Sequence, residues 1–226
     1  MLTIYTGYVM ERTMGQAERP GLTLAPPTGR RFHFDPGALC LELLATGGPG
    51  EFARFEVLHV PADLARWAGE SRLRWPSDLE LTVGEGELDL VRRTRDALFL
   101  LTADRAHGRP LDPGQLSVVN AAAAEPPLTA RIEPDGTRAW VPGATGARLL
   151  STVMRDAVDL FTGPYADRVR ECATGNCSLL FVDTSRPGRR RWCAMERCGN
   201  RQKARAHRAR GEAAQPAVSS DAARTS

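Results

Sequence analysis

Two short stretches near the carboxyl end decide this fold: Cys-Ala-Thr-Gly-Asn-Cys at residues 172–177 and Cys-Ala-Met-Glu-Arg-Cys-Gly-Asn-Arg at residues 193–201. Each holds two cysteines separated by four residues, and fifteen residues lie between Cys177 and Cys193. Such a pair can place two thiolates on one ion, and the intervening stretch is long enough for a hairpin that brings the pairs together. The spacing predicts a closed tetrahedral Zn²⁺ site with four protein ligands: Cys172, Cys177, Cys193 and Cys198.

A site of this kind is structural, because four protein ligands leave no position at which the metal could activate water. A module of about 40 residues also needs the metal, since its own apolar core is too small to hold it folded. The alternatives are two disulfides or free thiols. The short loops and the absence of an export signal argue against disulfides, and the repeated spacing argues against unrelated thiols.

The residues around the cysteines favour a hairpin and a helix. A strand is expected over residues 178–183, where β-formers cluster, and a returning strand over residues 189–193, with Pro187-Gly188 in the turn. Trp192 is large enough to cover the small core. The stretch over residues 199–210 consists mostly of helix formers. The expected module is a knuckle, a β-hairpin and a helix, in a treble-clef-like arrangement.

The same region is strongly basic. Residues 168–210 carry twelve Arg or Lys and three acidic residues, a net charge of +9, whereas residues 1–167 carry a net charge of −5. A Zn–tetrathiolate of charge −2 would leave the module with a net charge of about +7. A basic module beside a mildly acidic body favours a polyanion as partner, most often nucleic acid. The alternative is a solvated surface that is basic without binding anything.

The candidate nucleic-acid contacts lie on both sides of the second cysteine pair. Three arginines precede it on the expected hairpin, and four basic residues follow it on the expected helix. Spacings of four and three place Arg201, Arg205 and Arg208 along one side of that helix. Such groups could clamp two phosphate strands or hold a helix in the major groove, and the spacing alone does not distinguish DNA from RNA. The full set is Arg189, Arg190, Arg191, Arg201, Lys203, Arg205 and Arg208.

The rest of the chain has the composition of a globular protein. Of 226 residues, 42% are hydrophobic and 25% are charged, which is typical of folded domains. No apolar run reaches the roughly 18 to 20 residues of a membrane span. The first ten residues lack the basic start and the cleavage site of a signal peptide. We therefore expect a cytoplasmic protein without membrane contact.

Apolar spacing predicts a mainly helical body. Helices are expected over residues 87–106, over residues 113–125 and over residues 146–161, with a shorter one from Pro61. A β-hairpin is expected over residues 128–141. The expected fold class is thus mainly α: a helical N-terminal domain with a small β-hairpin, followed by the compact four-cysteine zinc module.

These patterns divide the chain into four parts. We expect a mobile N-terminal segment at residues 1–31, a helical domain at 32–167, a zinc finger at 168–210 and a disordered tail at 211–226. The tail has no apolar face to bury. Residues 32–46, at the start of the helical domain, are largely apolar, and their pattern leaves helix and strand open.

Other chemically capable residues are expected to be structural. Cys40 lies in an apolar run and is expected to be a small buried hydrophobe. Arg92, Arg93 and Arg95 are expected on a solvated helix face rather than around an anion pocket. The sequence contains no Gly-x-Ser-x-Gly, phosphate-loop or dinucleotide fingerprint. We therefore expect that the protein is not an enzyme.

The finger resembles a known family. Cys-Gly-Asn-Arg at residues 198–201, with Arg-Trp-Cys-Ala-Met at residues 191–195 and Leu-Phe-Val-Asp-Thr-Ser at residues 180–185, is similar to the CGNR zinc finger. The four cysteines are the zinc ligands that this resemblance implies.

The body resembles the ABATE domain, which precedes this finger in bacterial proteins described as stress-induced transcription regulators. The resemblance is carried by Leu-Glu-Leu-Leu-Ala-Thr at residues 41–46 and by Pro-Ala-Asp-Leu-Ala-Arg-Trp at residues 61–67. Glu42 and Ala45 depart from the family pattern, which has Asp and Asn at those places. The resemblance implies a DNA-binding transcription regulator, and we expect its N-terminal domain to sense a signal or to form a homodimer.

Two other functions stay open. The zinc module could dock on an acidic protein partner, as a protein-interaction module. It could also act as a redox sensor, in which an oxidant ejects zinc from the thiolates and the basic module melts.

Overall fold

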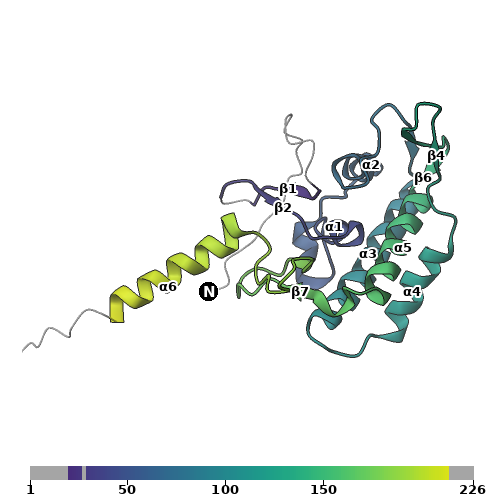
Figure 1. The fold of residues 1–226 in the computed structure, drawn as a ribbon. Coiled ribbons are helices and arrows are strands. Elements are labelled where there is room, and N and C mark those ends of the chain that lie inside the picture. The colour runs from purple at the N-terminus through teal and green to yellow at the C-terminus, as the bar shows by residue number, and fades with distance from the viewer. Residues whose placement is uncertain (1–19, 27–28, 214–226) are drawn as a thin grey trace, which may run out of the picture.

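The computed structural model describes residues 20–26 and 29–213. Figure 1 shows a helical body, a smaller module of loops and short strands beside it, and a last helix that extends away from both. Most of the segment expected to be mobile, residues 1–19 with 27 and 28, lies outside the described residues, as do residues 214–226 of the tail.

The body is built from α3, α4 and α5, which pack against one another, with α1 set against α3 and α5. Asp112 caps α4 by accepting a hydrogen bond from the backbone N–H of Gln115, and Thr145 caps α5 in the same way. The helices expected from periodicity are therefore confirmed. Their bounds are α1 Leu39–Leu44, α2 Pro61–Glu70, α3 Glu85–Ala106, α4 Pro113–Ala124 and α5 Gly146–Thr162, with 3₁₀ turns η1 at Gly50–Phe55 and η2 at Ala166–Arg168.

The strands are short and pair two by two. The expected hairpin within residues 128–141 is present, because Arg131 and Ala139 face each other across an antiparallel pair. The antiparallel pairs are β1 Leu22–Leu24 with β2 Phe32–Phe34, β4 Ala130–Ile132 with β5 Arg138–Trp140, and β7 Val169–Glu171 with β8 Leu180–Val182; the parallel pair is β3 Leu81–Thr82 with β6 Ala144–Thr145. The apolar stretch over residues 32–46 thus contains a strand followed by a helix.

Part of the segment expected to be mobile, residues 1–31, is ordered, because Leu22–Leu24 forms the first strand of the β1–β2 hairpin. Its inward side chains, Leu22, Leu24, Phe32 and Phe34, are at most 4% exposed. They lie in one apolar cluster with Phe181 and the four cysteines. Alternating apolar residues on two short strands bury one face of the hairpin, and this burial orders a stretch that its Gly and Pro content had marked as loop.

The zinc module ends in a π-helical turn, η3 at Met195–Gly199, which runs directly into α6 at Asn200–Ala213. The strand expected over residues 178–183 is present as β8, but its partner is β7 and not residues 189–193, which form no strand. The reason is burial on both faces of β8. Leu180 and Val182 join the core of the body, while Phe181 joins the cluster around the cysteines.

The arginines of α3 also differ from the expected solvated face. Arg95 is 1% exposed, and its guanidinium donates hydrogen bonds to the carboxylates of Glu56 and Asp96. Arg92 donates to the backbone carbonyls of Leu58 and His59. These side chains hold the loop after η1 against α3. Arg93 is exposed, as expected.

Two further residues of the apolar stretch are buried in the body. Cys40 is fully buried, which confirms its expected role as a small core residue. Glu42 is also fully buried and accepts hydrogen bonds from the backbone N–H and the guanidinium of Arg72. Burial raises the pKa of Glu42, against the opposing effect of Arg72.

Candidate metal centre and basic surface

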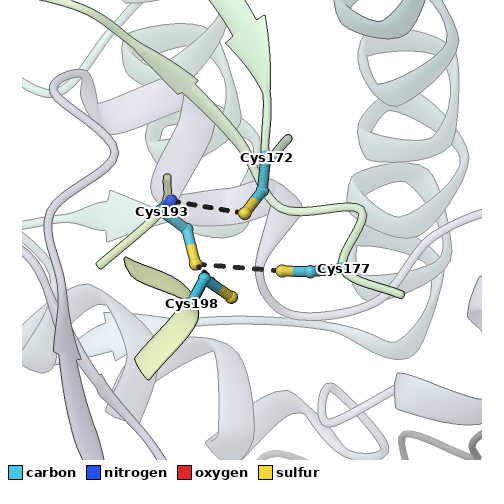
Figure 2. A group of neighbouring side chains, drawn as sticks. All are labelled: Cys172, Cys177, Cys193 and Cys198. Carbon is cyan, nitrogen blue, oxygen red and sulfur yellow. Dashed lines mark hydrogen bonds between the residues drawn. The ribbon is translucent and has the colours of Figure 1, made fainter. Parts of the chain in front are cut away.

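The four cysteines of the two pairs come together at one point in the module. Figure 2 shows their sulfur atoms converging from separate segments of the chain. All four side chains are buried, with exposed fractions of 5% or less. Their Sγ atoms all lie within 4.8 Å of one another. The two pairs come together as expected, but without the expected hairpin between them, because β8 pairs with β7.

The spacing of these sulfurs fits a tetrahedral zinc ion. With Zn–S bonds of about 2.3 Å, the sulfurs of a tetrathiolate stand about 3.8 Å apart. In the structure, the Sγ atom of Cys193 lies 3.8 Å from that of Cys177 and 3.5 Å from that of Cys198. The donor set is all sulfur, which suits zinc, and four protein ligands fill a tetrahedral shell.

Backbone hydrogen bonds hold three of the four cysteines in place. The N–H of Cys172 donates to the carbonyl of Leu179 at 3.0 Å and extends the β7–β8 ladder. The N–H of Cys177 donates to the carbonyl of Thr174 at 2.9 Å, which closes the knuckle turn. In η3, the N–H of Cys198 donates to the carbonyl of Ala194 at 3.0 Å.

The thiols shift one another's ionisation. Hydrogen bonds from Cys177 and Cys193 lower the pKa of Cys172 to about 6. Its hydrogen bond with Cys172 raises the pKa of Cys177, and Cys172 and Cys177 together raise the pKa of Cys193. Four packed sulfurs therefore do not all ionise on their own. A divalent cation supplies the charge that a full set of thiolates requires.

One arginine serves the sulfur cluster directly. The Nη2 atom of Arg201 donates to the Sγ atom of Cys198 at 3.0 Å. Hydrogen bonds from Cys172, Cys177 and Cys193, with a further one from Arg201, lower the pKa of Cys198. Sequence reasoning placed Arg201 among the nucleic-acid contacts, and the structure places its guanidinium on a metal ligand. Its position three residues after Cys198, one helical turn away, is the signal that could have indicated this contact.

A second arginine of the predicted set, Arg190, faces the protein interior. Its guanidinium donates to the carbonyls of Asp35, Trp192 and Cys193, and it lies 4.2 Å from the centroid of the Phe181 ring. Its backbone N–H donates to the carboxylate of Asp183 at 2.7 Å. Burial lowers the pKa of Arg190. These contacts join Asp35, the residue that follows β2, to the second cysteine pair.

The remaining five residues of the set are exposed on the outside of the module. Two of them flank Arg190, and Arg191 covers the ring of Trp192 at 5.4 Å. The other three lie on α6, which starts two residues after the last cysteine and extends away from the molecule (Figure 1). We call these residues the basic surface: Arg189, Arg191, Lys203, Arg205 and Arg208.

The N-terminal hairpin is a part of this site that sequence reasoning missed. The backbone N–H of His33 donates to the carboxylate of Glu196 at 2.7 Å, and the guanidinium of Arg197 lies 4.5 Å from the centroid of the Phe32 ring. Both acceptor and cation belong to η3. The period-two placement of Leu22, Leu24, Phe32 and Phe34 around a Pro- and Gly-containing loop was the signal that could have revealed the hairpin.

Two family models match the chain. One is ABATE, described as "Putative stress-induced transcription regulator", over residues 37–164. The other is the CGNR zinc finger, over residues 168–211. A comparison with curated proteins found no match. Both resemblances stated from the sequence are confirmed, the cofactor that suits the cluster is zinc, and neither family is an enzyme family. Within the described part of the chain, no helix has the length and apolar character to cross a bilayer.

Proposed function

Because this chain belongs to the ABATE family and carries a CGNR zinc finger, we propose that it is a DNA-binding transcription regulator without catalytic activity. In this proposal the protein acts in the cytoplasm. The helical body senses a signal or pairs with a second copy, and zinc fixes the geometry of the basic surface.

One observation carries the proposal: the four buried sulfurs lie at the base of α6, and four cationic side chains of that helix are exposed, Lys203, Arg205, Arg208 and Arg210. Cys198 belongs to η3, which continues into α6 without a break. A metal bound to Cys198 therefore fixes where α6 starts and in which direction it leaves the module. Arginines on a flexible peptide would lack this fixed direction.

The shape of α6 favours double-stranded DNA. Fourteen residues of helix rise about 21 Å at 1.5 Å per residue. A single exposed helix of this kind fits the major groove of B-DNA, whereas the major groove of an RNA duplex is too narrow and deep for side chains to read. Lys203, Arg205 and Arg208 would contact phosphates from this helix, and the residues beside Arg190 would contact the flanking backbone.

Fluorescence anisotropy with a labelled random-sequence duplex tests the proposal. The zinc-loaded protein is expected to bind, and the logarithm of the affinity should fall linearly with the logarithm of the salt concentration. Each neutralised phosphate contributes about 0.9 to that slope. Replacing both Lys203 and Arg208 by Gln should weaken binding and lower the slope by about 2. The control is Arg93→Gln, which removes an exposed charge from α3 in the body.

The outcomes separate the candidate functions. Binding that ignores salt and both variants, or no binding to any duplex, contradicts the proposal. Tighter binding to an RNA duplex or single strand would replace DNA by RNA as the partner. Capture of one acidic protein that survives nuclease treatment would favour the protein-interaction module. Zinc loss and loss of duplex binding under mild peroxide would favour the redox sensor, although the burial of all four sulfurs argues against easy oxidation.

A further inference from the structure

A cavity of about 540 Å³ lies where the helical body meets the zinc module. Its walls come from Phe34 of β2, from α1, from η1, from Phe99 of α3 and from the knuckle loop at residues 175–180, and Arg205 of α6 also lines it. The cavity therefore borders the body, a metal ligand (Cys177) and the basic surface at once. Its volume falls within the range of roughly 300 to 1,000 Å³ that is common for small-molecule sites.

One part of the wall is aromatic. The rings of Phe52 and Phe99 lie with their centroids 4.7 Å apart and are tilted by 40°. Phe55 adjoins Phe52, with its ring centroid 6.4 Å away. Leu44 and Leu179 extend the apolar wall from α1 and from the knuckle loop. Aromatic walls of this kind favour a ligand with a flat aromatic ring, since tilted and offset ring contacts add to the free energy gained from burial.

The polar part of the wall is cationic. Arg54 lies 3.6 Å from Glu51 and 4.8 Å from the centroid of the Phe55 ring, so its charge already has a partner. Arg205 differs, because none of the acidic side chains that the structure describes forms an ion pair with its guanidinium. Apart from the zinc ligand Cys177, the charged side chains of the wall are Arg54, Arg205 and Glu51, which together leave one positive charge. An anionic group on a ligand would complement that charge.

From these observations we propose that the cavity binds a small aromatic anion, such as an aromatic carboxylate or sulfonate. The ring packs against Phe52 and Phe99, and the anionic group pairs with Arg205. Because the ligand contacts the body and the knuckle loop together, it favours the arrangement in which these parts are packed.

The site also links the ligand to DNA, a step that rests on the proposed function. Arg205 belongs to both the cavity wall and the basic surface. A guanidinium paired with a ligand anion is no longer available to a phosphate. The ligand should therefore weaken DNA binding and remove about one phosphate contact from the salt slope, and DNA should weaken ligand binding by the same factor.

A matched pair of dyes tests the binding site on the zinc-loaded full chain. The anionic probe is 1-anilinonaphthalene-8-sulfonate, and the neutral probe is N-phenyl-1-naphthylamine, which has the same rings without the sulfonate. Saturable binding of the anionic dye at one site per chain is expected, with weaker binding of the neutral dye. Circular dichroism and the thermal midpoint, measured on the same samples, ensure that the dyes report on folded protein.

Two variants of α6 locate the anion. Arg205→Gln should weaken binding of the anionic dye about two- to five-fold, as expected for one ion pair that is partly exposed, and should leave the neutral dye unchanged. Arg208→Gln is the matched control, because it removes a charge from the same helix outside the cavity wall. It should change neither dye.

Two variants of the wall locate the ring. Phe52→Ala should weaken both dyes, and Ser178→Trp should exclude both by filling space in the cavity that Ser178 lines. The second variant covers the case in which the first does not fold. Dye binding that is insensitive to these wall variants, or equal affinity of the two dyes together with no effect of Arg205→Gln, overturns the proposal.

The dye titrations contain no DNA, so they are independent of the proposed function. If the dyes behave as expected and no duplex is bound, the cavity site stands and the DNA-binding function fails. If duplexes bind but the wall variants do not alter dye binding, the DNA-binding function stands and the cavity site fails. If both bind, a saturating concentration of the anionic dye should lower the salt slope of duplex binding by about 1.

Discussion

The body and the zinc module are held together in different ways. The body has a continuous apolar core formed by the five helices α1 to α5 with the neighbouring loops. The cluster around the cysteines contains ten buried residues, of which four are the cysteines themselves and four belong to the β1–β2 hairpin. Of the other two, Ala45 comes from the body and only Phe181 is an apolar residue of the module. The module therefore depends on a metal and on a hairpin from the other end of the chain.

The boundary between the body and the module in the sequence therefore does not coincide with the boundary between their two apolar cores. Leu180 and Val182 of the module lie in the core of the body, and the N-terminal hairpin lies in the core of the module. A substitution in one part should mainly destabilise that part and should have a smaller effect on the stability of the other.

Removal of zinc should have the largest effect, and it should be confined to the module. Structural zinc contributes about 10 to 16 kcal/mol in small zinc-binding units, and the module lacks an apolar core to replace it. Chelation, or Cys198→Ser, should abolish amide protection over residues 172–200 in hydrogen exchange and leave α3 and α5 protected. The control is Cys40→Ala, which changes a buried cysteine of the body, and this variant protein should still bind one zinc ion in the module. Retained protection in the metal-free module would refute the proposed dependence.

Arg95→Met should reverse that pattern by destabilising the body. Arg95 is buried and bonded to Glu56 and Asp96, so its removal leaves two carboxylates without their cation. Loss of one partner of a buried pair costs about 3 to 5 kcal/mol, and the partial exposure of the carboxylates places this variant near the lower end. Urea denaturation should measure the loss, while the zinc content stays at one ion per chain. Arg93→Met is the control on the exposed face, and equal losses in both variants would argue against the buried pair.

Leu24→Ala should weaken the module without touching any metal ligand. Leu24 is fully buried in the cluster around the cysteines. Truncation of a buried leucine costs about 2 to 3 kcal/mol when the neighbouring side chains can partly close the cavity. The expected readout is faster zinc release to a chromogenic chelator, with little change in the urea midpoint of the body. Thr23→Ala, one residue away on the opposite face of β1, should release zinc at the normal rate.

Arg201→Gln should have a smaller effect on the same readout. Its guanidinium donates to the sulfur of Cys198, and loss of such a supporting contact commonly lowers metal affinity by about tenfold. Arg201→Lys keeps the charge and should recover part of the affinity. Competition with a zinc indicator measures both. Equal affinity in all three proteins would mean that the contact has no influence on the metal.

The dependence of stability on pH should show the smallest effect. Burial raises the pKa of Glu56, but the hydrogen bonds and charge of Arg95 outweigh it and leave that pKa below its ordinary value of 4.5. The contribution of Glu56 is therefore present above pH 4.5 and is lost as the pH falls through its lower folded-state pKa. The stability difference between the protein and its Glu56→Gln variant should shrink over that range. A constant difference down to pH 2 would contradict the assigned pair.

Features that depend on neighbouring residues could be read from the sequence. The repeated spacing of the four cysteines predicts their site, and α3 and α5 follow from apolar periodicity. The turn around Gly136 likewise indicates the hairpin of β4 and β5. In each case the pattern lies within one continuous segment of the chain.

Features that depend on partners far away in the sequence could not be predicted from it. The strand β8 was expected to pair with the residues that follow it, but its buried faces match β7 and the body. Arg95 and Arg190 are charged residues whose partners, Glu56 and the carbonyl of Asp35, lie far away in the sequence. Periodicity assigns such residues to the surface, because it contains no information about a distant partner. For the same reason the cavity at Arg205 has no sequence signal.

The central claim is that one zinc ion bound by four sulfurs shapes the basic surface. X-ray absorption at the zinc edge on freshly purified protein tests it most directly. The expected result is one zinc per chain, with four sulfur neighbours at about 2.3 Å and no nitrogen or oxygen neighbour. A metal-free protein, or a zinc ion with fewer than four sulfur neighbours, would contradict it.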